Sequence, residues 1–463
     1  MLLMMSGRSL LAAAITVLLA GCATTPTESL PTEPPLPSTF ADTASGMPPS
    51  EGWWTHFDDP RLNAVVGAAV SDNFSLVAAR ERLRQANAAA RIAGADALPA
   101  LDGSGDARVS REEGSNAESY SVGVVASYEV DLWGRIDATI ESAELEAGAT
   151  RADLQAAYIS LTAETADTYY SLLLQRAIVD LLEQQRTTNQ QVADLIRVRY
   201  RNGQAQLDEY LRQQRLTEAS TADLLSARAT LEEQRNQLAA LLGRPAEALE
   251  LPEGHEITQL PPIPAVGIPA EWLQRRPDLQ AAWLRVRAAD ADTAAAIANQ
   301  YPRLDLSASL ETAATSPSNL FEDWVSSLAT SLTVPLFRGG ALRAEVERSQ
   351  AARAVAFNEY AQNVVDAVAE VEIALSNARY DRNRLESLNR QLELAEAVVD
   401  RLRGRYLSGA TEYLDVLSAL TTLQDVQRQQ LEARWALLLD RIALIRTIAG
   451  GWNTGESEAS ENS

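Results

Sequence analysis

The chain has 463 residues, of which 46% are hydrophobic and 6% aromatic, and its formal net charge at pH 7 is −23. So negative a chain is a poor nucleic-acid binder, and we expect no nucleic-acid partner. All 40 basic residues are Arg, which excludes a Walker-type phosphate loop and a Schiff-base enzyme, because both need Lys. Two His and one Cys leave too few ligands for a zinc site or a thiol enzyme. We therefore expect no enzymatic activity, no cofactor and no metal.

The first 22 residues, MLLMMSGRSLLAAAITVLLAGC, begin with one Arg followed by an apolar stretch. The stretch is too short to remain as a membrane-spanning helix, so residues 1–21 are predicted to be a signal peptide. Its Leu-Ala-Gly-Cys ending resembles the bacterial lipobox, which implies that Cys22 is acylated and anchors the mature chain in lipid. The alternative is an ordinary signal peptide with an unrelated Cys. Ala23 is not the Asp that retains lipoproteins at the inner membrane, which implies the outer membrane.

The Pro- and Thr-rich residues 22–51 are predicted to be an extended, lipidated tether without a core. Two longer regions follow, and they have the same order of elements. The first, 52–249, predicts a helix over 73–97, strands over 101–111 and 119–131, a long Pro-free helix over 135–201 and a return helix over 207–242. After a Pro-rich connector, 250–269, the region 270–452 predicts a helix over 270–299, two strands between 303 and 334, a long helix over 341–407 and a return helix over 413–448. An acidic, disordered tail, 453–463, ends the chain.

The two regions also share sequence. RVRYRNGQAQLDEYL begins at Arg197, and RGRYLSGATEYLDVL begins at Arg403. A second matched pair is LPALD, which ends at Asp102, and YPRLD, which ends at Asp305. A third pair is SYEVDLWG and SLTVPLF, and the three pairs occur in the same order. This pattern indicates an internal two-fold duplication.

The strand segments are about ten residues long and alternate apolar with polar side chains, as tilted strands of a transmembrane β-barrel do. In the first strand, Leu101 and Val109 share one face, while Asp102 and Arg108 share the other. A water-soluble sheet with one wet face has the same pattern, so alternation alone leaves both possibilities open. Four strands cannot close a barrel, since small barrels need about eight, and open edges in a bilayer are costly. We therefore expect three copies to complete one twelve-stranded barrel.

The helices over 135–201 and 341–407 are each roughly 100 Å long at 1.5 Å per residue, and helices of that length must pack as coiled coils. In each half, the two shorter helices have a combined length of roughly 91 to 99 Å, so stacked end to end they match one long helix. Gly203 and Gly409 follow the long helices, where a left-handed cap suits Gly. We expect the strands at one end of the helices and both Gly turns at the other.

Several motifs, taken in order, resemble the outer-membrane factors of bacterial export pumps, which include TolC-like, OprM-like and NodT-like proteins. They are Trp53-Trp54 with Asp59-Pro60, Tyr128–Arg135, Arg275–Asp278, Val334–Phe337, the two Arg-Tyr-x-x-Gly turns, and Gly450–Trp452. The resemblance implies an α+β membrane protein, a homotrimer in the outer membrane of a Gram-negative bacterium. Its twelve-stranded β-barrel would continue into a long α-helical coiled-coil barrel in the periplasm. The family also implies a periplasmic adaptor protein and an inner-membrane pump, expected to be of the RND type.

The resemblance assigns roles to the acids that follow the turns. It implies that Asp208 and Asp415 form lumen-facing constriction rings, whose repelling carboxylates would favour cations. The alternative is that both are solvated acids at helix N-termini. Relatives often carry a second Asp one turn after Asp415, but here the residue is Ser418, which predicts a less selective gate.

The turns themselves carry further candidates. By resemblance, four residues hold the aperture shut through hydrogen bonds between helices: Tyr200, Tyr406, Arg199 and Arg405. The alternative is packed Tyr side chains with solvated Arg neighbours. Gly203 and Gly409 mark the tips that the adaptor would grip.

Two functions are compatible with these patterns. One is a passive outer-membrane channel that conducts small molecules, including drugs, to the exterior. The other is a periplasmic coiled-coil scaffold or adaptor lipoprotein without a pore. The four alternating strands favour the channel, because an adaptor needs no strands of bilayer length.

Overall fold

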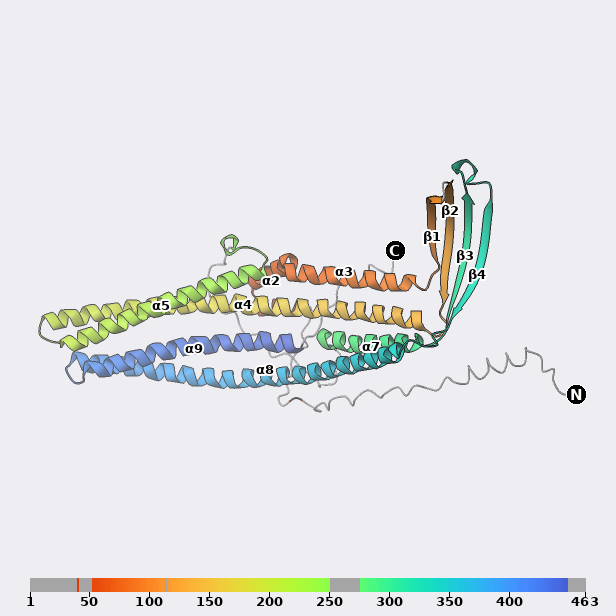
Figure 1. Cartoon of the computed structure of the whole chain (residues 1–463). Helices are drawn as coiled ribbons and strands as arrows, with labels where there is room; N and C mark the ends of the chain where they lie inside the picture. Colours follow the sequence, from red (N-terminus) through yellow and green to blue (C-terminus); the bar gives the residue numbers. More distant parts are fainter. Residues whose placement is uncertain (1–39, 41–51, 113–114, 250–274, 449–463) are drawn as a thin grey trace. The chain divides into compact units, whose positions relative to one another are not determined.

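The computed structural model describes residues 40, 52–112, 115–249 and 275–448 (Figure 1). The chain divides into two units, Met1–Glu33 and Pro34–Ser463, and all described residues belong to the second. The predicted signal peptide, Cys22, most of the tether, the connector over 250–269 and the acidic tail lie outside the described residues.

The described elements follow the predicted order. They are η1 (Trp53–Phe57), α2 (Pro60–Asp72), α3 (Phe74–Ala95), β1 (Ala100–Glu112), β2 (Ser115–Val130), α4 (Arg135–Arg201), α5 (Leu207–Leu241), η2 (Ala246–Ala248), α7 (Pro277–Ala298), β3 (Arg303–Ala314), η3 (Pro317–Asn319), β4 (Trp324–Thr333), α8 (Ala341–Leu407) and α9 (Tyr413–Ile448). Both long helices, α4 and α8, have the predicted bounds, and each contains 67 residues.

Two features of the helices differ from the prediction. The helix predicted over 270–299 begins, in the described residues, only at Pro277. Arg276 before it is extended, with ψ of 117°, because a residue that precedes Pro is disfavoured in the helical region. The short helix α2 was not predicted. Asp59 caps it by accepting the backbone N–H groups of its first turn, and Pro60 opens it.

Strands β1 to β4 form one antiparallel sheet in chain order. The register pairs Leu101 of β1 with Ala126 of β2, and Val124 of β2 with Leu310 of β3. Further residues of the apolar rows on neighbouring strands are paired in the same way. The apolar rows therefore share one face of the sheet, and the polar rows share the other. Leu328 of β4, on the apolar face, is 83% exposed. The predicted strands and their alternation are confirmed.

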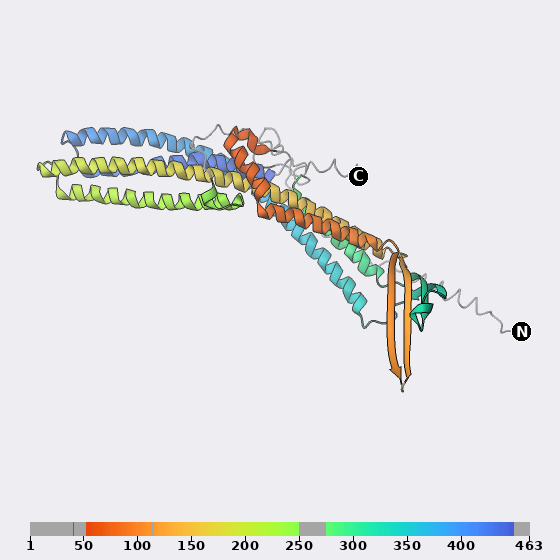
Figure 2. The same cartoon turned by 90° about the horizontal axis from the view of Figure 1, so that it is seen from above.

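The long helices organise the shorter ones. Helix α4 packs against α3 and α5, and α8 packs against α7 and α9, while α4 also contacts α7 and α9 and so joins the two halves. Figures 1 and 2 show the sheet beside the ends of the helices to which its strands connect. The turns between α4 and α5 and between α8 and α9 lie at the opposite end.

In the first half, the two short helices meet end to end, as predicted. Asn73 caps α3 by accepting the N–H of Leu76, and its amide donates to the carbonyl of Leu241, the last residue of α5, at 2.9 Å. Gly243 then turns the chain with φ of 64°. A Cβ at this position would lie 2.5 Å from the carbonyl oxygen of Asp72, so only Gly fits.

Arg276 makes the corresponding connection in the second half. This buried residue precedes α7 and donates to the carbonyl of Thr447, near the end of α9, at 3.4 Å. It also donates to Glu370 of α8 at 2.9 Å and pairs with Asp278 of α7 at 2.5 Å. One guanidinium therefore ties three helices together.

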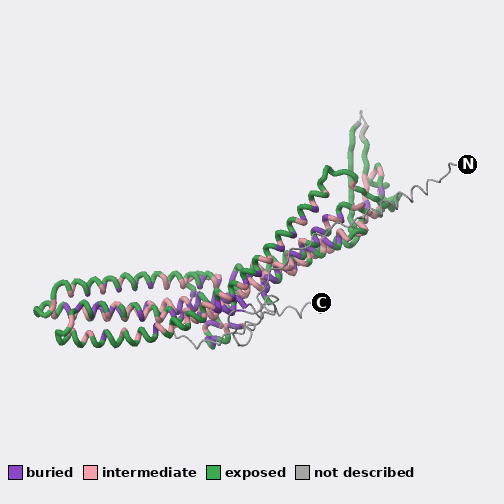
Figure 3. The backbone as a smooth tube through the Cα atoms, turned by 90° about the horizontal axis from the view of Figure 1, so that it is seen from below, coloured by how far each residue is buried: buried purple, intermediate pink, exposed green. Residues whose placement is uncertain are grey.

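The largest core cluster joins η1, α2, α4, α5 and α9, and Trp53, Tyr170 and Trp435 are among its buried members. Buried positions concentrate in the middle of the helices, whereas the strands and turns are mostly exposed (Figure 3). Among the described helices, none is by itself long and apolar enough to cross a membrane. The pair α2 and α3, bent by 45°, passes that test together by length and composition.

Candidate gate at the hairpin turns and joint between strands and helices

Both hairpin turns use the same backbone motif. After α4, the N–H groups of Gly203 and of the next residue bond to the carbonyls of Tyr200 and Arg199, at 3.0 and 2.8 Å. After α8, Gly409 and its successor repeat both bonds at the same distances. Gly203 and Gly409 have φ of 71° and 76°, so the predicted left-handed caps are confirmed. Their role as docking tips stays a prediction.

Tyr406, in the last turn of α8, reaches across to the other hairpin. Its hydroxyl donates to Oε2 of Glu209, in the first turn of α5, at 2.8 Å. The guanidinium carbon of Arg199, at the end of α4, lies 4.8 Å from the centre of the Tyr406 ring. Burial, together with the bond to Glu209, raises the pKa of Tyr406 to about 12, so its hydroxyl keeps the proton that it donates. The end of α8 is thus held against both α4 and α5.

A second contact between the hairpins starts from Tyr413, the first residue of α9. Its hydroxyl donates to Oε1 of Gln213 of α5, and its ring centre lies 5.5 Å from that of Tyr406. The sequence did not single out Glu209, Gln213 or Tyr413. Each lies in the first two turns of a returning helix that follows an Arg-Tyr-x-x-Gly motif, and this position was the available signal.

Tyr200 and Arg405 make their described contacts within their own hairpins. The ring of Tyr200 stacks on that of Tyr210 of α5, with centres 6.4 Å apart and planes 5° apart. Arg405 donates to the carbonyl of Ala410 at 3.1 Å, inside the second turn. The two turns therefore share a backbone conformation, but their tyrosines contact different partners.

Asp208 and Asp415 lie in the first turns of α5 and α9. A carboxylate oxygen of Asp208 lies 3.6 Å from Nε of Arg212, and Asp415 accepts the hydroxyl of Thr411 at 2.6 Å. Both side chains are exposed, and their negative charge is favoured by the positive end of the helix dipole. Two exposed carboxylates thus lie beside the turns, one at each hairpin.

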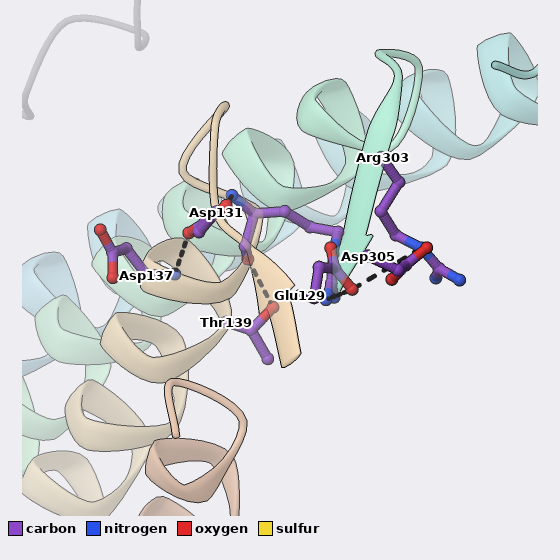
Figure 4. Close-up of polar contacts among 7 residues, drawn as sticks. Glu129, Asp131, Asp137, Thr139, Arg303 and Asp305 are labelled. Carbon is purple, nitrogen blue, oxygen red and sulfur yellow. Dashed lines mark hydrogen bonds and ion pairs between the residues drawn. The ribbon is translucent and has the colours of Figure 1, made fainter. Parts of the chain in front are cut away.

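A second polar cluster joins the sheet to the helices (Figure 4). Arg135, the first residue of α4, donates two hydrogen bonds to Glu129 of β2, at 3.0 and 2.9 Å. Asp131 accepts the backbone N–H groups of Arg135 and Asp137, at 2.8 and 2.9 Å, and so caps α4. Arg303 of β3 lies 3.7 Å from the same Glu129. These charge-assisted contacts fix how β2 and β3 leave the helices.

An aromatic pair completes this joint. The rings of Trp133 and Tyr301 stack with centres 4.9 Å apart, and the indole N–H of Trp133 donates to the carbonyl of Pro302 at 2.7 Å. The loop between β2 and α4 is therefore bound to the loop between α7 and β3. Among the described residues, no group of three or more His, Cys, Asp or Glu side chains could hold a metal ion.

Long paired helices that carry a four-stranded amphipathic sheet at one end and two hairpin turns at the other define the class of TolC-like outer-membrane channels. The chain belongs to the outer membrane efflux protein family, because the sequence model described as "Outer membrane efflux protein" matches residues 65–244 and 268–450.

Individual relatives agree with this assignment. The pyoverdine export outer membrane protein OpmQ of Pseudomonas aeruginosa is 30% identical, over 97% of this chain and 98% of its own. The cation efflux system protein CusC of Escherichia coli O6:H1 is 25% identical, over 97% of this chain and 100% of its own. A solved structure of the outer-membrane channel OprN matches with a TM-score of 0.84 and 29% identity, over 93% of this chain and 100% of that one.

The protein is therefore an outer-membrane efflux channel. Of the two functions compatible with the sequence, the channel is the one supported, and the interpretation as a scaffold or adaptor without a pore is set aside. Proteins of this family are channel and transport proteins rather than enzymes.

Proposed function

We propose that this channel is the outer-membrane component of a tripartite efflux pump and works as a homotrimer. Three four-stranded sheets close one twelve-stranded barrel, and the helices of the three chains continue it as an α-helical barrel. The channel is passive and conducts small molecules, including drugs, that an inner-membrane pump of the RND type delivers through a periplasmic adaptor.

The edges of the sheet carry this proposal. In the described sheet, β1 and β4 each have one hydrogen-bonded neighbour, so each leaves a row of backbone groups without a strand partner. Leu101 of β1 and Leu328 of β4 expose 73% and 83% of their surface on the apolar face. Lipid can cover that apolar face, but it cannot form hydrogen bonds with the backbone groups of the edge strands. Pairing β1 of one copy with β4 of the next supplies these hydrogen bonds at both edges.

The helices support the same arrangement. Ile92 of α3 is 72% exposed, and Val355 and Ile373 of α8 are 57% and 59% exposed. Placing α3 of one copy against α8 of the next would remove these apolar side chains from water. The equal lengths of α4 and α8 support the internal duplication, which supplies two similar hairpins per chain.

The turns form the proposed gate. In a trimer, six turns surround the end of the tunnel, and the contacts of Tyr406 with Glu209 and Arg199 hold neighbouring hairpins together in the closed state. Tyr200 and Arg405 maintain the shape of their own turns. Three copies each of two acids, Asp208 and Asp415, supply rings of negative charge that favour cations.

The remaining assignments concern attachment. Gly203 and Gly409 let the chain turn tightly at the tips where the adaptor docks. Acylated Cys22 anchors the N-terminus in the outer membrane, which adds to the hold that the sheet provides.

Disulfide cross-linking between β1 and β4 tests the trimeric barrel. Ser104 of β1 and Ser327 of β4 both belong to the polar rows. They lie at opposite edges of the sheet, where three strand spacings alone separate them by about 14 Å. That separation is too long for a disulfide within one chain. We expect one of three variants, S104C/S327C, S104C/A329C or S104C/S331C, which test successive registers on the polar face of β4, to give covalent trimers in membranes that conduct ions in planar bilayers. Single-Cys variants are the controls, and chains that stay monomeric in membranes with every pairing would refute the barrel.

A further inference from the structure

Asn189 lies at the centre of a buried polar layer between three helices, and its side chain is 0% exposed. Its amide nitrogen donates to the hydroxyl of Ser220 of α5 at 2.6 Å and to Oε1 of Gln424 of α9 at 3.3 Å. The amide of Gln424 donates back to Oδ1 of Asn189 at 2.9 Å. Gln213 of α5, also 0% exposed, donates to the backbone carbonyl of Asn189 at 2.7 Å. Asn189 of α4 is therefore bonded to α5 and α9 at once.

Neighbouring amides extend the layer in both directions. One turn earlier on α4, Gln185 donates to the carbonyl of Gln424 and to Oε1 of Gln427, at 3.2 and 3.1 Å. On the side of the turns, the hydroxyl of Tyr413 bonds to Gln213. The polar layer thus connects to the contact between the hairpins.

This layer interrupts the apolar packing of α4 against α9. On the side of the strands, the large core cluster brings Tyr170 of α4 close to Trp435 of α9, with ring centres 6.3 Å apart. On the side of the turns, a separate small cluster contains Ile196 of α4 and Leu417 of α9. From Asn189 to the end of α4 is about 18 Å at 1.5 Å per residue. A short apolar end piece is therefore separated from the main core by amides.

The two kinds of packing respond differently when helices part. Apolar side chains become exposed to water, which costs free energy. Amide groups replace their hydrogen bonds to one another by hydrogen bonds to water, with little net change in free energy. Paired amides are also directional, and a buried polar residue in a coiled coil fixes the register of its helices. The end piece of the helices can therefore separate at this layer without disturbing the core. The directional amide pairs restore the same register when the helices come together again.

We propose that the Asn189 layer is the pivot of the gate. During opening, the piece between this layer and the turns swings outward, and the amide pairs keep α4, α5 and α9 in register so that the turns close again correctly. Asn189 and Gln424 are positioning residues in this mechanism. The proposal rests on the gate at Tyr406 put forward above.

Replacing the amide pair by leucines tests the pivot. The double variant N189L/Q424L would join the two apolar clusters into one, and we expect trimers that open less often. The frequency of opening in planar bilayers should fall roughly tenfold, which corresponds to 1.4 kcal/mol. Q175L is the matched control, because Gln175 of α4 donates to the carbonyl of Ala227 of α5 at 2.8 Å and the described bond does not involve α9. The single variant Q424M, at a partly exposed position, replaces the double variant if leucines at both positions prevent folding.

The same recordings with Y406F separate the two proposals. If Y406F leaks and the leak is reduced by N189L/Q424L, both stand. If Y406F leaks equally with and without the leucines, the pivot is refuted and the gate remains. If Y406F does not leak, the gate at Tyr406 is refuted, and the pivot is then judged from the spontaneous openings of N189L/Q424L alone. Unchanged openings, or an equal loss of openings in Q175L, would overturn the pivot.

Discussion

Tyr406 and Glu209 are separated by 197 positions in the chain, yet the hydroxyl of one lies 2.8 Å from the carboxylate of the other. The bond joins the end of α8 to the start of α5, so it spans the two hairpins rather than closing one of them. A hydrogen bond to a charged acceptor contributes about 1.5–3 kcal/mol. Three such bonds in a trimer would hold the turns together firmly enough for their loss to be measurable.

Replacing Tyr406 by Phe should therefore open the channel. Y406F keeps the ring and its contact with Arg199 but removes the hydroxyl that bonds to Glu209. We expect a higher single-channel conductance in planar bilayers and greater sensitivity of cells to antibiotics too large for intact outer membranes. Y200F is the matched control, because the described contact of Tyr200 is a ring stack with Tyr210. Equal conductance in Y406F and the unaltered channel would contradict the gate.

Neutralising the acids beside the turns should weaken ion selectivity. The double variant D208N/D415N removes two charges from each chain, or six from the proposed trimer, so we expect the preference for cations at neutral pH to fall towards that of a non-selective pore. Reversal potentials in a salt gradient measure this preference. D425N changes an exposed acid on α9 that pairs with Arg428 at 2.9 Å, and it should leave the preference unchanged. Unaltered reversal potentials in D208N/D415N would remove the ring assignment.

Enlarging the turn glycines should impair export more than assembly. Their left-handed φ values make alanine cost roughly 1–2 kcal/mol at each position, although a Cβ would meet no atom within 4 Å at either one. We expect G203A/G409A to form trimers of slightly lower thermal stability with strongly reduced export in whole cells. G404A, inside α8 and also without a neighbour within 4 Å, should preserve export and gain stability. Loss of trimers in G203A/G409A would mean that these glycines serve folding instead of docking.

The stability of the helical region should depend on pH through Asp440. This half-buried acid of α9 has its pKa raised to about 6 by burial and then by Asp381 of α8, while Arg441 acts in the opposite direction. The folded protein thus holds this proton more tightly than the unfolded chain, whose Asp titrates near 3.8. Protonated Asp440 therefore stabilises the folded protein relative to the form with ionised Asp440. This stabilisation is present at low pH and is lost as pH rises through about 6.

Melting temperatures measured by circular dichroism between about pH 4 and pH 7 check this dependence. We expect D440N to flatten the fall with rising pH and to be more stable than the unaltered protein at pH 7. D425N, at an exposed acid of the same helix, should retain the original slope. A slope that is unchanged in D440N would show that other groups are responsible.

Much of the fold was predictable because its signals are local. The absence of Pro through 135–201 and 341–407, with Gly203 and Gly409 just beyond, gave the bounds of both long helices. Period-two alternation gave the four strands. Helix α2 was not predicted because its signal is a single cap, Asp59, in a short segment. Helix α7 begins later than predicted because Pro277 can be the first residue of a helix but disfavours a helical conformation of the residue before it.

The site was predictable only in part, because its contacts depend on how separate hairpins pack. The motif pointed to Tyr406, but nothing near it in the sequence indicates that Glu209 is its acceptor. Asn189 was missed for a related reason. An amide on a long polar helix is expected to be solvated, and its burial becomes visible only when α5 and α9 are placed around it.

The unequal tyrosines have a consequence for whatever approaches the tips. One turn of each chain presents a stacked pair, Tyr200 on Tyr210. In the other turn, Tyr406 is hydrogen-bonded to Glu209 of α5, on the neighbouring hairpin. A threefold assembly would then display six similar loops in two alternating sets. A partner that surrounds them with six identical subunits would have to seat half of those subunits differently from the rest.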